Sequence, residues 1–151
     1  MAIEMSFQTD NDAFRKSFSS QAKKITKSVI DKAIRDSSKF MKEELVTRTP
    51  IGIRSTPSRG PGNLREGWSD LKKIAGGFSF ENPVVYAGVV EEGKYPGVGP
   101  RTVEQNGQIY SFQAAGGIVQ PMIIDESFIN QLSNLIEKSV ERQMKKLFRG
   151  K

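Results

Sequence analysis

Cysteine and histidine are both absent from the 151-residue chain, and each absence removes a class of chemistry. Without cysteine there is no disulfide and no thiolate site, which is typical of chains made in a reducing compartment, so we expect synthesis in the cytosol. Without histidine the chain lacks the commonest general acid–base group and the commonest neutral metal ligand. We therefore predict that the protein is not an enzyme, with no catalytic residues, no metal site and no cofactor.

Long hydrophobic runs are also missing. No window approaches the roughly 18 apolar residues that a membrane-spanning helix needs, and residues 1–12 hold no apolar run flanked by basic residues, as a signal peptide would. We expect neither export nor a membrane partner. The length suits a single domain over residues 1–151, and 36% hydrophobic with 26% charged residues is slightly more polar than average, as exposed helices or arms would be.

Charge is unevenly distributed along a chain whose formal net charge is +6. Residues 1–60 contain twelve lysines and arginines against seven acids, whereas residues 61–124 contain five against six. A basic N-terminal segment could meet the phosphates of a nucleic acid or an acidic protein surface, and composition alone leaves both open.

Helical periodicity is strongest in the N-terminal third. Apolar residues recur there at three- and four-residue steps, which predicts a helix over residues 12–47: Phe14, Phe18, Ala22, Ile25, Val29 and Ala33. Thr9 and Asp12 resemble a capping box at its start, and Thr49-Pro50 should end it, because a residue before proline is pushed out of the α region.

This helix should be kinked or broken near Asp36-Ser37-Ser38, where the apolar stripe slips before it resumes with Phe40, Met41 and Leu45. Unbroken, its roughly 35 residues would span about 50 Å. The stripe then either covers the domain's own sheet or docks its far end on an adjacent subunit.

The middle of the chain alternates between loops and short strand candidates. Glycine and proline make residues 51–62 a long loop, and residues 93–100 form a second cluster of breakers. Residues 68–80, 84–91 and 108–112 are predicted strands, the first two paired through a turn at Glu81 to Pro83. A proline keeps the apolar run 118–124 from being a central strand throughout.

A last helix follows Asp125, which we predict to be its N-cap. Its apolar residues fall at helical spacing: Phe128, Leu132, Leu135, Ile136, Val140, Met144 and Leu147. We predict an α+β fold: an N-terminal helical arm (1–48), a loop (49–67), a small antiparallel β-sheet region with long loops (68–124), and a C-terminal helix (125–148) packed on the sheet.

Short strings in fixed order carry a family resemblance. They are Thr49-Pro50, Gly62-Asn63-Leu64-Arg65, Tyr86-Ala87, Glu91-Glu92-Gly93 and Gln120-Pro121-Met122, set between two helical segments. Their order and spacing resemble the tail-completion or neck family of long-tailed bacteriophages. The family's Asp-Thr pair is absent, and an insertion separates the first two strings. Each string also has a purely structural interpretation, since glycines turn the chain and prolines end helices.

The resemblance implies a virion structural protein that forms a homo-oligomeric ring, a hexamer or a ring of similar size, at the head–tail joint. It would be assembled in the host cytoplasm and would join the tail to the head. Implied partners are a tail terminator or tail tube protein on one side and head-completion or portal-side proteins on the other. DNA would pass through the ring.

Charged residues in the loops are the candidate assembly contacts: Arg54, Arg59, Arg65, Glu91, Glu92 and Lys94. Trp68, Tyr86 and Phe128 are the expected core aromatics. We expect the loops at residues 51–62 and 93–107 to be mobile in the free monomer and ordered in the assembly.

The alternative function is that of a basic nucleic-acid-binding protein. Four lysines of the first helix are spaced so that several share one side of it, and three aromatic residues could stack on bases: Lys16, Lys23, Lys24 and Lys27, with Phe7, Tyr95 and Tyr110. The aromatic residues are not interleaved with the basic run as they are in typical stacking platforms.

Three catalytic or ligand-binding motifs are rejected. Adjacent Glu91 and Glu92 would point to opposite faces of a strand and share no site. The remaining acids lack the spacing of a calcium loop. Gly97-Val98-Gly99-Pro100 has no following helix or lysine, as a phosphate-binding loop requires.

Overall fold

The computed structural model describes residues 3–8, 20–51 and 63–149, together with the side chains of Ile3 and of residues 27–51 and 63–149. The elements, in chain order, are β1 (Ile3–Gln8), α2 (Ser20–Asp36), α3 (Ser38–Arg48), α4 (Asn63–Glu66), β2 (Lys72–Ile74), β3 (Gly77–Asn82), α5 (Ala87–Glu92), β4 (Thr102–Gln105), β5 (Gln108–Ser111), α6 (Val119–Ile123) and α7 (Glu126–Arg149).

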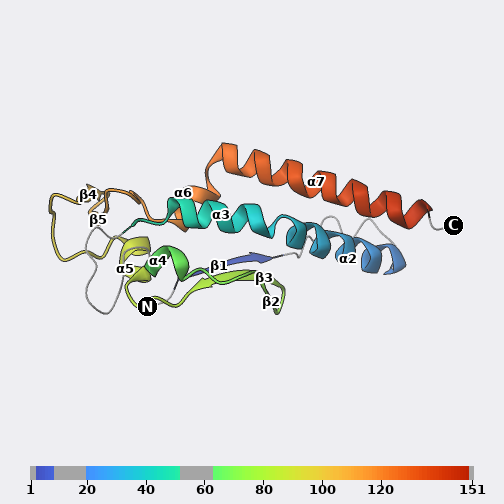
Figure 1. Cartoon of the computed structure of the whole chain (residues 1–151), viewed down its shortest axis with the longest axis horizontal. Coiled ribbons are helices and arrows are strands. Elements are labelled where there is room, and N and C mark those ends of the chain that lie inside the picture. Colours follow the sequence, from blue (N-terminus) through green and yellow to red (C-terminus); the bar gives the residue numbers. More distant parts are fainter. Residues whose placement is uncertain (1–2, 9–19, 52–62, 150–151) are drawn as a thin grey trace.

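Three layers build an elongated molecule (Figure 1). A small sheet lies on one side of α2 and α3, and α7 lies on the other side, in contact with α2. Helices with small antiparallel sheets agree with the predicted α+β class. The prediction that the C-terminal helix packs on the sheet is wrong, because α2 and α3 cover the inner face of the sheet and α7 packs on their outer side.

A ring stack and a hydrogen bond are among the contacts that fasten α7 to this helical layer. The rings of Phe40 and Phe128 stack with their centroids 5.6 Å apart. The hydroxyl of buried Ser139 donates to an Asp36 carboxylate oxygen at 2.6 Å. The predicted stripe of α7 therefore packs against another helix, and periodicity alone does not say which layer an amphipathic helix will cover.

The predicted interruption of the N-terminal helix is confirmed as a break at Ser37, between α2 and α3. The hydroxyl of Ser37 donates to the carbonyl of Ala33 at 2.9 Å, a local bond by which serine bends helices. The helix ends at Arg48, and Thr49 is extended before Pro50, as predicted. The predicted cap at Thr9 and Asp12, with Phe14 and Phe18, lies outside the described residues.

The three-stranded sheet has the order β1-β3-β2, with antiparallel pairing throughout. Strand β3 pairs with β2 across the turn that contains Gly76, whose φ is +84°, and not through the turn predicted at Glu81 to Pro83. Its other neighbour, β1, was not predicted. Phe78 and Phe80 are buried with Met41 and Leu45 in the core.

Two segments predicted as strand or loop differ from the prediction. The predicted strand at residues 84–91 is wrong, because residues 87–92 form α5, which ends at Gly93 in the left-handed conformation typical of helix C-termini. The apolar run 118–124 contains α6. The strand predicted at 108–112 is confirmed as β5. Its partner β4 lies inside the predicted loop 93–107. The turn Asn106-Gly107, in which both φ angles are positive, joins β4 to β5.

The expected core aromatics divide two to one. Trp68 and Phe128 are buried, at 3% and 4% exposure. Tyr86 is exposed at 36%, so its predicted place in the core is wrong. It directly precedes α5, and the core position there belongs to Ala87. None of the described helices is long and apolar enough to cross a membrane.

We expect Trp68→Ala to lower the free energy of unfolding by about 3–5 kcal/mol, because it would leave a cavity in the core. Urea titration followed by circular dichroism would measure the loss. Tyr86→Ala is the matched control and should change stability by no more than about 0.5 kcal/mol, as surface substitutions usually do. Equal losses in the two variants would contradict the assignment of Trp68 to the core.

Candidate functional site

Buried Thr49 joins three segments at the end of α3. Its hydroxyl donates to the Leu45 carbonyl at 2.6 Å and accepts the indole N–H of Trp68 at 2.8 Å. Its own carbonyl accepts a hydrogen bond from Arg65 Nε at 2.6 Å. The last carbonyls of a helix have no partner within the helix, so these bonds fasten α4 and Trp68 to the end of α3.

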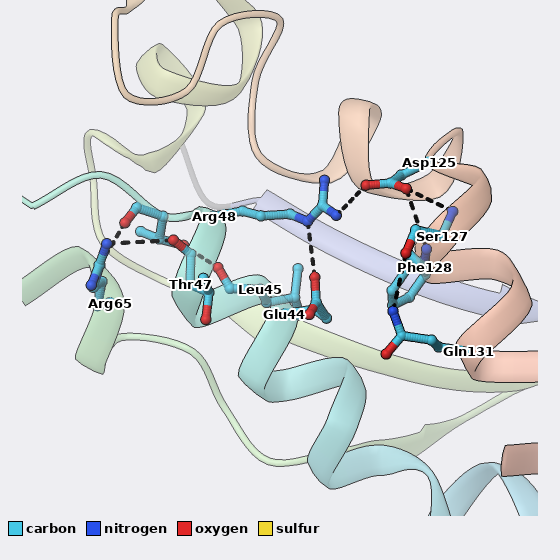
Figure 2. Close-up of polar contacts among 10 residues, drawn as sticks. Glu44, Leu45, Thr47, Arg48, Arg65, Asp125, Ser127, Phe128 and Gln131 are labelled. Atoms are coloured by element: carbon cyan, nitrogen blue, oxygen red, sulfur yellow. Dashed lines mark hydrogen bonds and ion pairs between the residues drawn. The ribbon is translucent and has the colours of Figure 1, made fainter.

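Arg48 connects the same helix end to the start of α7 (Figure 2). Its Nη2 donates to Asp125 Oδ2 at 2.5 Å, and its Nε donates to Glu44 Oε2 at 3.2 Å. Burial opposes the charged guanidinium, but the bonds to Asp125 and Glu44 outweigh burial and raise the pKa of Arg48. The result is a partly buried ion pair between residues 77 positions apart.

Asp125 also caps α7, as predicted. Its Oδ1 accepts the backbone N–H groups of Ser127 at 2.8 Å and Phe128 at 3.3 Å (Figure 2). The hydrogen bond from Arg48 is the main cause that lowers the pKa of the Asp125 carboxyl below its ordinary value of 3.8. One carboxylate therefore serves as helix cap and as ion-pair partner.

Glu91, at the end of α5, caps α6. Its carboxylate accepts the backbone N–H groups of Ile118 at 2.7 Å, Val119 at 3.0 Å and Gln120 at 3.1 Å. Gly117 precedes them with φ +100°, and a Cβ there would lie 2.7 Å from the Glu91 carbonyl oxygen. Only glycine fits this approach, so Glu91 and Gly117 together set α6 against α5.

Glu92 and Lys94 form an ion pair with each other, and both side chains are partly exposed. Between them Gly93 has φ +63°, and a Cβ there would lie 2.8 Å from the ring of Tyr110. The sequence predicted that Glu91 and Glu92 point to opposite faces of a strand. This is wrong, because both residues lie in helix α5. They still share no site, because Glu91 binds α6 and Glu92 binds Lys94.

Arg65, predicted from the sequence as an assembly contact, has internal partners in the structure. It donates to the carbonyls of Thr49 and Thr47, at 2.6 and 3.4 Å (Figure 2). Arg54 and Arg59 lie outside the described residues. A role in assembly stays a prediction for all six charged candidates. Among those in the described part of the chain, Glu92 and Lys94 pair only with each other.

The strings that carry the resemblance gather at one end of the molecule. The end of α3, α4, α5 and α6 all lie at the end away from the C-terminus (Figure 1). Two side-chain-to-backbone clusters hold them, one around Thr49 and one around Glu91. The roles of Arg48 and Gly117 were not predicted, since no local pattern indicates that either residue has a partner far along the chain.

One of the three aromatic residues proposed to stack on nucleic-acid bases is not available for stacking. Tyr110 is buried, and its hydroxyl donates to Gln108. Burial raises the pKa of the half-buried Tyr95. Lys27 is exposed, while Lys16 and the side chains of Phe7, Lys23 and Lys24 lie outside what the structure describes. The structure contradicts a stacking role for Tyr110.

Within residues 27–51 and 63–149 no three acidic side chains come together to hold a metal ion. Comparison with protein-family models, with curated proteins and with solved structures finds no match.

Glu91→Ala should lower the free energy of unfolding by about 1–2 kcal/mol, because it leaves several N–H groups at the start of α6 without their acceptor. Glu92→Ala, one position along, is the matched control and should cost no more than about 0.5 kcal/mol. Thermal unfolding of both variants checks the difference. A Glu92 variant as unstable as the Glu91 variant would refute the capping role.

Asp125→Asn should lower the melting temperature at neutral pH, because it removes the charge that pairs with Arg48. The pKa of Asp125 is lower in the folded state than in the unfolded state. The ionised carboxylate therefore adds to the free energy of unfolding above the unfolded-state pKa, and this contribution is lost as pH falls through the folded-state pKa. The difference between wild type and variant should stay constant from about pH 8 to about pH 5 and shrink below about pH 4. Calorimetry across pH measures it, and a difference that grows on acidification would show that the Asp125 charge does not stabilise the fold.

Proposed function

We propose that this chain is a structural protein of a bacteriophage virion, a tail-completion or neck component that forms a ring at the head–tail joint. The observation that carries the proposal is the resemblance of ordered strings to that family, together with where those strings lie. Thr49, Arg65 and Glu91 belong to them, and each holds a loop or short helix at one end of the molecule.

A role in assembly accounts for this use of side chains. They bind backbone groups where loops begin and end, and so hold those loops in place. A contact surface made of loops needs such support to keep its shape. Apolar side chains are also exposed in the loops and in α6 and its end: Ile51, Val98, Phe112, Ile123 and Ile124. Exposed apolar groups of this kind mark interaction sites when they gather into patches.

A ring of identical subunits needs no chemistry, only a contact between two different surfaces of the subunit whose rotation closes. The proposed neighbours are a tail terminator or tail tube protein on one face and head-completion or portal-side proteins on the other. DNA would pass through the ring, where basic side chains can meet phosphates without reading sequence.

Light scattering after size exclusion tests the proposal, with purified tails or emptied heads added to the chain. We expect a ring, or a monomer that joins the particles. Replacing both Glu92 and Lys94 by alanine should weaken binding to the tails or heads without lowering the melting temperature, because the two are partly exposed charged residues beside the capped α6. The control pair Glu137→Ala with Lys138→Ala, also exposed, should associate normally.

A chain that stays monomeric at every concentration and ignores particles would contradict the proposal. If that monomer also retards duplex DNA with a steep dependence on salt, the alternative of a basic nucleic-acid-binding protein would replace it.

A further inference from the structure

A groove of about 760 Å³ lies between the α2–α3 layer and the β2–β3 hairpin. A second hollow, which shares Arg35 and Lys73 with it, continues along α2. The lining residues of the helices recur every three or four positions from Lys27 to Thr47, across the break at Ser37. The two hollows therefore follow one continuous helical face, and we call them together the basic groove.

Cations outnumber acids two to one along the basic groove. Its cations are Lys27, Lys32, Arg35, Lys39, Lys42 and Lys73, and its acids are Asp31, Glu43 and Asp70. Each acid already pairs with a groove lysine, at 3.5 Å from Lys73, 3.8 Å from Lys39 and 2.6 Å from Lys42, respectively. Lys32 pairs with Asp36 at 4.0 Å, so the positive excess that remains for a ligand comes from Lys27 and Arg35.

Apolar side chains form part of the same wall. Val46 and Leu71 are half-buried there, and the guanidinium of Arg35 lies 5.6 Å from the ring centroid of Phe78. A groove with an apolar wall and a basic rim fits a protein segment that presents an exposed apolar side chain beside a carboxylate. The apolar wall favours such a segment over a phosphate backbone, which presents charged groups and no apolar side chain to place against it.

Cations are missing from another part of the chain. Residues 102–137 contain no lysine or arginine and four acids, in a protein of net charge +6. Within this stretch Ile124 is 74% exposed at the corner between α6 and α7, with exposed Ile123, Glu126 and Ile129 beside it in the sequence. Asp125, between Ile124 and Glu126, pairs with Arg48, so Glu126 supplies the charge of this surface, and we call the four residues the acidic corner.

The acidic corner and the basic groove face away from each other. The α6–α7 junction lies on one side of α3, and the β2–β3 hairpin lies on the other side (Figure 1). The two surfaces cannot meet within one molecule. A contact between them must join different copies. Such a contact leaves one groove and one corner unused at the ends of the assembly, so further copies can add, and the assembly closes into a ring where the rotation permits.

We propose that the acidic corner of one copy docks in the basic groove of the next, with Ile124 against the apolar wall and Glu126 among the cations of the rim. The inference rests on the proposed function, because it names the two surfaces that would build the ring. The contact is heterologous and involves no symmetric face.

Two variants test it in the full-length chain. The groove variant carries Arg35→Glu and Lys39→Glu, both exposed, with the Lys39 side chain 88% exposed. The corner variant carries Ile124→Asn and Glu126→Gln, also exposed. The control is Lys138→Glu with Arg142→Glu, which makes the same charge change at the same spacing on α7. None removes a buried group, and circular dichroism should show all three folded.

Sedimentation velocity across concentration gives the readout. Each variant alone should need on the order of 10- to 100-fold higher concentration to associate than wild type, because the attraction is lost or reversed. The control should match wild type. An equimolar mixture of groove and corner variants should form a dimer and nothing larger, because only one intact groove and one intact corner remain per pair.

The possible failures are distinguishable. If wild type associates and both variants associate as wild type does, the docking surfaces are wrong and the proposed function survives. If the groove variant keeps self-association but loses binding to duplex DNA, nucleic acid occupies the groove and the inference is overturned. A wild type that never associates, with or without particles, would overturn the proposed function and this inference with it.

Discussion

The end of α3 is the constraint on which the rest of the structure depends. Helix carbonyls at a C-terminus need outside partners, and here Arg65 donates to one of them while the hydroxyl of Thr49 joins Leu45 to Trp68. Arg48, one residue before Thr49, reaches Asp125 and thereby sets where α7 begins. If this helix end were released, α4, the core indole and the C-terminal helix would all lose an anchor.

A second anchor places α6 beside α5. Glu91 there does for α6 what Asp125 does for α7, because each carboxylate accepts N–H groups at a helix start. Both anchors lie at the same end, so the short helices and loops of that end are held by side chains, while α2 and α7 extend past the sheet at the other end (Figure 1). The molecule thus combines a loop-rich end with a long helical pair, and its basic groove and acidic corner lie on different sides.

Local signals predicted the local structure. The slip in the apolar stripe marked the break at Ser37, Thr49-Pro50 marked the helix end, and Asp125 marked the cap of α7. Local sequence patterns did not predict the structure where contacts with a distant segment determine it. The valines before Gly93 suggest a strand, but the left-handed glycine ends a helix there, and β1 is a strand only because β3 lies beside it. The partner of Arg48 lies 77 positions away, and no spacing rule reaches that far.

Disulfide trapping can test directly whether the acidic corner of one copy meets the basic groove of another, because the natural chain has no cysteine and an introduced pair reacts alone. Chains carrying Ile124→Cys and chains carrying Lys39→Cys would be mixed under mild oxidation, and each would also be oxidised alone. Docking of corner in groove predicts a cross-linked pair that forms rapidly in the mixture and slowly in either variant alone. Rapid linkage between two copies of the Ile124→Cys chain, with no mixed product, would refute this docking, because that result requires a symmetric contact between copies.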